Sequence, residues 1–209
     1  EVQGICELSD VVVMCLGLDA SLEGEEGDTG NSYASGDKVD LLLPEVQREL
    51  VEAVCKVGKP VVLLNMTGSA MDLRYAQEHA DAIVQTWYPG ARGGKDVAEI
   101  IFGEVSPSGK LPVTFYNSID ELPDIHDYSM KNRTYKFFEG TPVYEFGYGL
   151  TYSEIEEKWI DENTVEIINK GEYDTDYSVL KFEYIPHKSL CGFKKVRLNV
   201  GESLTVKFE

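Results

Sequence analysis

Residues 10–18 read DVVVMCLGL and residues 22–28 read LEGEEGD, and together they are the most informative part of the chain. The first is short, rich in β-branched residues and bounded by polar ones, so it predicts a fully buried β-strand. The second places three glutamates and an aspartate on a glycine-hinged loop directly after that strand. In open α/β sheets, ligands bind at the carboxyl ends of the strands. This acidic loop is therefore a candidate site for general acid chemistry.

Strand-like and helix-like segments alternate on the C-terminal side of the acidic loop. Short apolar runs predict strands, and apolar residues at helical spacing predict helices. In chain order we expect strand 10–18, helix 45–55, strand 60–65, helix 70–79, strand 82–87, helix 95–102 and a shorter strand 109–115. Strands that alternate with helices pair in parallel through right-handed crossovers, so the first part of the chain is predicted to be an α/β domain.

Near residue 118 the pattern changes. Residues 119–152 are rich in Tyr, Pro, Asp and Gly without a sustained period, which predicts an ordered connector. Four β-like runs follow at 166–169, 178–185, 193–198 and 203–208, separated by glycine-containing turns. They predict a small antiparallel β module. The predicted domains are therefore 1–118, 119–152 and 153–209.

Charge and hydropathy exclude several classes of partner. The 209 residues include 19 basic and 37 acidic ones, for a net charge of −18. Such a chain has no excess of Lys and Arg to neutralise phosphates, so we expect neither nucleic acid nor an anionic membrane as its partner. No apolar stretch approaches the ~20 residues of a membrane-spanning helix, and the N-terminus does not read as a signal peptide. We expect a cytoplasmic location, while secretion of the intact protein stays open.

Calcium binding is the main alternative to general acid chemistry for the acidic loop. Asp19, Ser21 and Glu23 resemble the start of an EF-hand loop. The twelfth position, however, is Gly30, where a bidentate glutamate is required. We therefore predict no metal and no cofactor.

Two aromatic residues, Trp87 and Tyr88, close the predicted strand 82–87. An aromatic ring offers apolar surface to the C–H groups of a sugar, so both are candidates for substrate binding. The alternative is that both pack in the core or at an interface, and the sequence leaves the two readings open.

Motifs along nearly the whole chain carry a more specific signal. They include TWYPG at 86–90, SPSGKLPVTF at 106–115, YEFGYGLTY at 144–152 and LCGFKKV at 190–196, in addition to the acidic loop and LLPEVQREL at 42–50. In this order they resemble the C-terminal half of glycoside hydrolase family 3, the β-glucosidases and β-xylosidases.

The resemblance implies a partial α/β/α sandwich with a mostly parallel sheet, followed by a fibronectin type III-like antiparallel β domain. In that family the sandwich supplies the acid/base glutamate and a preceding (β/α)8 barrel supplies the aspartate nucleophile. The 209 residues leave no room for the ~250 residues of a barrel. The chain alone is therefore expected to be inactive.

The resemblance also proposes roles for single residues. The family's Gly-Glu-Gly element aligns with either Glu25, which follows Gly24, or Glu26, which precedes Gly27. Both are catalytic candidates, and Glu23 is a third. Glu23, Asp28, Trp87 and Tyr88 are candidates for substrate binding.

Two functions follow from these expectations. The first is the acid/base-bearing portion of a retaining, exo-acting β-glycosidase that hydrolyses terminal β-linked glucose or xylose. The second is a non-catalytic carbohydrate-binding or interaction module of the same fold. The expected partners are a carbohydrate and the barrel, in cis or in trans. We also expect self-association, because a sandwich without its first strands exposes apolar surface.

Overall fold

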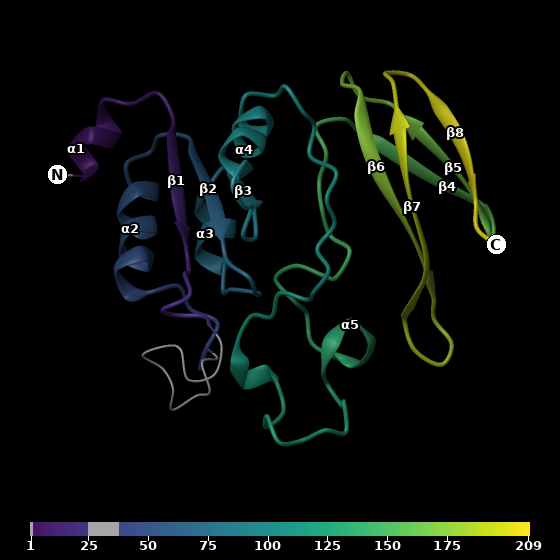
Figure 1. Ribbon diagram of the computed structural model, residues 1–209, viewed down its shortest axis with the longest axis horizontal. Helices are drawn as coiled ribbons and strands as arrows, with labels where there is room; N and C mark the ends of the chain where they lie inside the picture. Colours follow the sequence, from purple (N-terminus) through teal and green to yellow (C-terminus); the bar gives the residue numbers. More distant parts are fainter. Residues whose placement is uncertain (1, 25–37) are drawn as a thin grey trace. The chain divides into compact units, whose positions relative to one another are not determined.

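A computed structural model describes residues 2–24 and 38–209 of the chain (Figure 1). The chain forms two compact units whose segments interleave along the sequence. The first unit is drawn from residues 1–93, 115–122 and 141–143, and the second from residues 94–114, 123–140 and 144–209. The boundaries of these units differ from those of the predicted domains 1–118, 119–152 and 153–209. The predicted domain boundaries stay a prediction.

The first unit contains a parallel sheet of three strands. These are β1 (Val12–Gly17), β2 (Val61–Met66) and β3 (Ala82–Gln85), in the order β1-β2-β3. Cys15 lies opposite Leu64, and Leu64 lies opposite Val84. The parallel sheet predicted from the alternation of strands and helices is confirmed.

Helix α2 (Glu45–Cys55) connects β1 to β2, and helix α3 (Arg74–His79) connects β2 to β3. The first unit also contains α1 (Val2–Glu7) and the 3-10 helix η2 (Ile119–Glu121). Helix α2 follows Pro44, whose fixed φ suits the start of a helix, and it buries Val51 and Val54. Helix α3 is shorter than predicted. Helix α4 (Gly93–Ile101) begins where the second unit takes over, and α5 (Thr134–Phe137) belongs to the second unit.

The prediction that residues 10–18 form a fully buried strand is wrong in one respect. Met14 and Leu16 are buried, but Val11 and Val13 are 51% and 43% exposed, and Cys15 is exposed too. Because side chains of a strand alternate between two faces, this pattern means that one face of β1 is covered and the other is not, within the described residues.

The prediction of a strand at residues 109–115 is also wrong. The Leu111 N–H donates to the Tyr148 carbonyl at 2.8 Å, and the Gly147 N–H donates to the Leu111 carbonyl at 2.7 Å. These backbone groups therefore pair with a loop and not with the parallel sheet. Pro112 has no N–H and interrupts any longer ladder.

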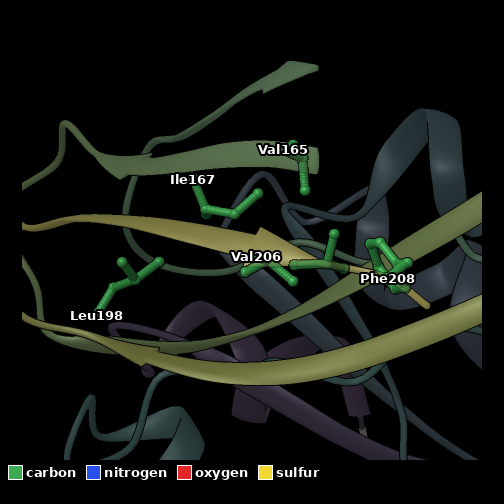
Figure 2. Packing of buried hydrophobic residues seen from close by; sticks show 6 residues of the cluster. Val165, Ile167, Leu198, Val206 and Phe208 are labelled. Atoms are coloured by element: carbon green, nitrogen blue, oxygen red, sulfur yellow. The ribbon is translucent and has the colours of Figure 1, made fainter. Parts of the chain in front are cut away.

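The second unit contains an antiparallel β-sandwich. One sheet consists of β4 (Ile155–Asp161), β5 (Thr164–Asn169) and β8 (Ser203–Lys207), and the other of β6 (Thr175–Glu183) and β7 (Ser189–Leu198). The core is built from buried side chains of β5, β6, β7 and β8 and of the C-terminal Phe208 (Figure 2). The predicted antiparallel module is confirmed, with β4 as a strand that the sequence pattern missed.

Within the residues that the structure describes, no helix is long and apolar enough to cross a membrane.

Candidate active site

The carboxyl ends of β1, β2 and β3 lie at the same end of the sheet because the three strands are parallel. The loops that leave this end begin at residues 18, 67 and 86. The first of them carries the acidic stretch, and the third carries Trp87 and Tyr88. The topology therefore brings the start of the acidic loop, up to Gly24, and the loop with the aromatic pair to the same end of the sheet.

Gln47 of α2 fixes the end of β1. Its side-chain carbonyl accepts from the Gly17 N–H at 2.9 Å, and its amide group donates to the Gly17 carbonyl at 2.8 Å. This pair of bonds satisfies the last residue of an edge strand, which has no strand on its outer side in the described chain. The loop with the acidic residues therefore starts from a fixed point.

Buried polar side chains fix the loop after β2. The Asn65 amide donates to the Thr67 hydroxyl at 3.0 Å, and the Gln85 amide donates to the Thr67 carbonyl at 3.1 Å. Asn65 and Thr67 are fully buried. The Thr67 hydroxyl in turn donates to the Ser69 carbonyl at 2.9 Å, which ties the start of the loop after β2 to this buried cluster.

Glu23 joins all three loops. Its Oε2 accepts from the Tyr88 hydroxyl at 2.9 Å and from the Gly68 N–H at 3.2 Å, and its Oε1 accepts from the Ser69 hydroxyl. Its own N–H donates to the Asp19 carbonyl at 2.9 Å, which closes a turn after β1. The carboxylate is thus the point at which the acidic loop is tied to the loops after β2 and β3.

Lys38 adds a positive charge to this cluster. Its Nζ lies 4.0 Å from Glu23 Oε1 and donates to the Ala70 carbonyl at 3.1 Å. The side chains of Lys38 and Glu23 are 14% and 21% exposed. Burial lowers the pKa of Lys38, and the charges of Glu23 and Asp40 oppose that effect.

The environment of Glu23 favours its ionised form. Burial alone raises the pKa of this carboxyl group, but the hydrogen bonds from Ser69, Tyr88 and Gly68 and the charge of Lys38 outweigh burial and lower it. Burial, together with the hydrogen bond to Glu23 and its charge, raises the pKa of the Tyr88 hydroxyl, which therefore stays a donor. In this arrangement Glu23 is a carboxylate that accepts hydrogen bonds.

Replacing Glu23 by Gln is expected to destabilise the first unit in a pH-dependent way. A carboxyl group with a lowered folded-state pKa stabilises the fold above its unfolded pKa of about 4.5, and this contribution is lost as the pH falls through the folded pKa. At pH 7 we expect a loss of about 1–2 kcal/mol, because Lys38 loses its counter-charge and an amide group faces the Ser69 and Tyr88 donors. The loss should shrink towards pH 3.

Urea unfolding at pH 7, 5 and 3 measures this, followed through Trp87 fluorescence in a Trp159→Phe background. Glu49→Gln, at an exposed position of α2, is the matched control and should change little at any pH. A Glu23→Gln effect of equal size at all three pH values would contradict the assignment.

The aromatic pair is divided between two environments. Trp87 has a φ of +56° and packs edge-on against Phe115, with ring centroids 6.5 Å apart. Tyr88 is 51% exposed, with its hydroxyl on Glu23. Trp87 thus has the packing contact that the alternative reading predicted, and stacking of either ring on a sugar stays a prediction.

A cavity of about 440 Å³ lies beside this cluster. It is lined by the end of β1 and by Asp19, Gln47, Met66 and Tyr88, among others. Its size falls within the ~300–1,000 Å³ of small-molecule sites. Among residues 2–24 and 38–209, no group of three or more His, Cys, Asp or Glu side chains is placed to hold a metal ion.

Comparison with known proteins agrees with this architecture. The family model described as the glycosyl hydrolase family 3 C-terminal domain matches residues 1–152. This chain belongs to glycoside hydrolase family 3. The resemblance seen in the sequence motifs is thereby confirmed.

Several relatives of this family 3 chain are curated as glycosidases. It is 38% identical to a xylan 1,4-β-xylosidase of Xylanibacter ruminicola over 95% of its own length and 25% of the relative. It is 31% identical to a periplasmic β-glucosidase of Salmonella typhimurium, with 86% of this chain and 28% of the relative covered. The chain thus spans about a quarter of the length of these relatives.

Solved structures show the same fold. A β-D-glucoside glucohydrolase from Trichoderma reesei superposes with a TM-score of 0.88 at 25% identity, covering 99% of this chain and 35% of that one. A β-glucosidase from Erythrobacter marinus superposes with a TM-score of 0.82 at 32% identity, covering 99% and 30%. An α/β part followed by a fibronectin type III-like part is therefore the fold of this family 3 chain.

The predicted site residues of the family 3 chain fall into two groups. Glu23, Trp87 and Tyr88 lie in the described chain, and Tyr88 contacts Glu23. Glu25, Glu26 and Asp28 lie outside the described residues. Sequence reasoning did not identify Lys38, Gln47 or Ser69. The small polar run after the strand that ends at Met66 was the one available signal for Ser69.

Proposed function

We propose that this chain supplies the acid/base glutamate of a retaining, exo-acting β-glycosidase that removes terminal β-linked xylose or glucose. The nucleophilic aspartate is assigned to a barrel domain outside residues 1–209. Relatives curated as β-xylosidases and β-glucosidases support the substrate class. Retaining hydrolysis needs two carboxyl groups ~5–5.5 Å apart. In the proposed enzyme this chain supplies one of them and the barrel domain supplies the other.

One observation carries this proposal. Glu23 anchors the acidic loop at the carboxyl ends of the strands, through hydrogen bonds that its carboxylate accepts from Gly68, Ser69 and Tyr88. A loop anchored on one side can present the residues beyond it to a substrate with little loss of conformational freedom. Glu25 and Glu26 follow this anchor by two and three residues.

The environment of Glu23 guides the division of roles. A general acid must be protonated when the leaving oxygen departs, and the pKa of Glu23 is lowered. We therefore assign Glu23 to anchoring. Glu25 or Glu26 gives its proton to the glycosidic oxygen and then takes a proton from the attacking water. Asp28, Trp87 and Tyr88 remain the proposed substrate contacts.

A chimera tests the proposal. Residues 1–209 replace the matching part of the Xylanibacter ruminicola β-xylosidase, and hydrolysis of 4-nitrophenyl β-xyloside and β-glucoside is measured. We expect turnover by the chimera and none by the chain alone. A folded chimera without turnover would contradict the catalytic proposal. Binding of xylo-oligosaccharides by residues 1–209 alone would then favour the non-catalytic module.

A further inference from the structure

The segment 67–71, which follows β2 directly, binds the residue that comes before the acidic glutamates. Its Gly68 N–H and its Ser69 hydroxyl donate to the two carboxylate oxygens of Glu23. A Cβ on Gly68 would lie 2.8 Å from the Tyr88 ring and 3.3 Å from Glu23 Oε2. Carbon atoms pack at about 3.5–4 Å, so the backbone approaches the carboxylate and the ring as closely as a glycine allows.

The same segment binds a residue that comes after the acidic glutamates. Lys38 Nζ donates to the Ala70 carbonyl at 3.1 Å and contacts the Met71 sulfur at 3.0 Å. Met71 is fully buried, and the same Nζ lies 4.0 Å from Glu23 Oε1. Glu23 and Lys38 are 15 positions apart in the sequence, with Glu25 and Glu26 between them. Both ends of this stretch therefore meet on one short segment of the chain.

One buried hydroxyl joins this segment to the sheet. The Thr67 hydroxyl accepts from the Asn65 amide at 3.0 Å and from the Gln85 amide at 3.3 Å, and it donates to the Ser69 carbonyl at 2.9 Å. A hydroxyl has one proton and two lone pairs, so this group uses its full hydrogen-bonding capacity. Asn65 belongs to β2 and Gln85 ends β3. The hydroxyl thus links two strands to the segment that binds Glu23 and Lys38.

We propose that Thr67 is a positioning residue of the active site, because its hydroxyl holds the segment 67–71 where that segment binds both Glu23 and Lys38. Its role in catalysis rests on the proposed function, which places the acid/base glutamate between these two residues. Removing the hydroxyl leaves a buried amide and a buried carbonyl without this partner, which favours a displaced segment. A displacement of about 1 Å at a reacting group can cost about a hundredfold in rate.

The titration of Glu23 in the full 209-residue chain tests the proposal without any catalysis. Thr67→Val removes the hydroxyl and keeps the shape of the side chain, whereas Thr67→Ser keeps the hydroxyl. Two of the donors that lower the pKa of Glu23 come from the segment. We therefore expect carbon-13 NMR to show that this pKa rises towards its ordinary value in Thr67→Val and stays low in Thr67→Ser. The Glu23→Gln spectrum assigns the signal.

Thr114→Val is the matched control. Thr114 is also buried, but its hydroxyl has no hydrogen-bond partner among the described residues. The same substitution there should leave the pKa of Glu23 unchanged. If Thr67→Val does not fold, Thr67→Cys takes its place, because a thiol is a weak donor and acceptor and should raise this pKa part of the way. A folded Thr67→Val chain in which the pKa of Glu23 stays as in the parent would overturn the proposal.

The chimera tests the role in catalysis. We expect Thr67→Val to lower kcat/KM for xylobiose at least about tenfold, and Thr67→Ser and Thr114→Val to stay within about twofold of the parent. Circular dichroism verifies that each variant is folded. Equal losses in Thr67→Val and Thr67→Ser would mean that packing matters and not the hydroxyl, and unchanged turnover in Thr67→Val would also overturn the proposal. An inactive parent chimera contradicts the proposed function alone, and the titration then decides whether the Thr67 hydroxyl holds the segment.

Discussion

The Glu25→Gln/Glu26→Gln double variant of the chimera is expected to lose turnover of xylobiose by at least about a thousandfold. A positioned general acid and base contributes ~10²–10⁴-fold to rate, and both candidate donors are removed at once. Glutamine keeps the size and polarity of the side chain but holds no transferable proton. The measurement is kcat/KM for xylobiose, with circular dichroism to verify that the variant is folded.

The single variants decide between the two glutamates. Loss of proton donation matters most for a poor leaving group, because a good one departs without a proton. The single variant that removes the acid should therefore lose far more activity on xylobiose than on 2,4-dinitrophenyl β-xyloside. The other single variant should affect both substrates similarly.

Glu23→Gln belongs in the same series. We expect it to lower the stability of the fold and to lower kcat/KM by a similar factor for both substrates. The reason is that Glu23 contacts the loops and not the leaving group in this assignment. If Glu23→Gln shows the leaving-group dependence, then the acid is Glu23. Unchanged turnover in the Glu25→Gln/Glu26→Gln variant would refute the present assignment outright.

The sheet that carries the site was predictable because its signals are local. The strands 60–65 and 82–87 are short apolar runs between polar segments, and residues 45–55 have one apolar face. Each of these properties depends on residues close in sequence. Strand β4, with the sequence IEEKWID, was missed because its charged residues mask the alternation, and it is an edge strand of its sheet.

The cluster around Glu23 was less predictable for a physical reason. The distance in sequence between Glu23 and its partners is 45 residues for Gly68 and 65 for Tyr88. One of the donors is a backbone N–H, which any residue except proline carries. Composition and spacing place an acidic loop after a strand, but only the fold shows which donors meet the carboxylate. The exposed face of β1 was missed for the same reason, since burial depends on what covers a strand.

Replacing Gly17 by Ala is expected to destabilise the first unit by at least about 3 kcal/mol. A Cβ at Gly17 would lie 1.9 Å from the Met66 carbonyl oxygen and 2.6 Å from its carbon. These atoms are backbone of β2, so no side-chain rotation relieves the clash. Strand β1 must move away from β2, which weakens the bond from the Leu18 N–H to the Met66 carbonyl and both bonds between Gly17 and Gln47. Overpacking costs ~1–3 kcal/mol, and each lost hydrogen bond ~0.5–1.5 kcal/mol.

Urea unfolding followed through Trp87 fluorescence, in a Trp159→Phe background, measures this loss. Gly4→Ala is the matched control, because Gly4 lies in helix α1 of the first unit and a Cβ at that position meets no atom within 4 Å. Removing a glycine from a helix stabilises it by up to ~1 kcal/mol, so the two substitutions should have opposite signs. The loop with Glu23 leaves β1 directly after Gly17, so Gly17→Ala should also reduce the activity of the chimera. A Gly17→Ala chain as stable as the parent would mean that β1 and β2 do not approach each other closely at the edge where the acidic loop begins.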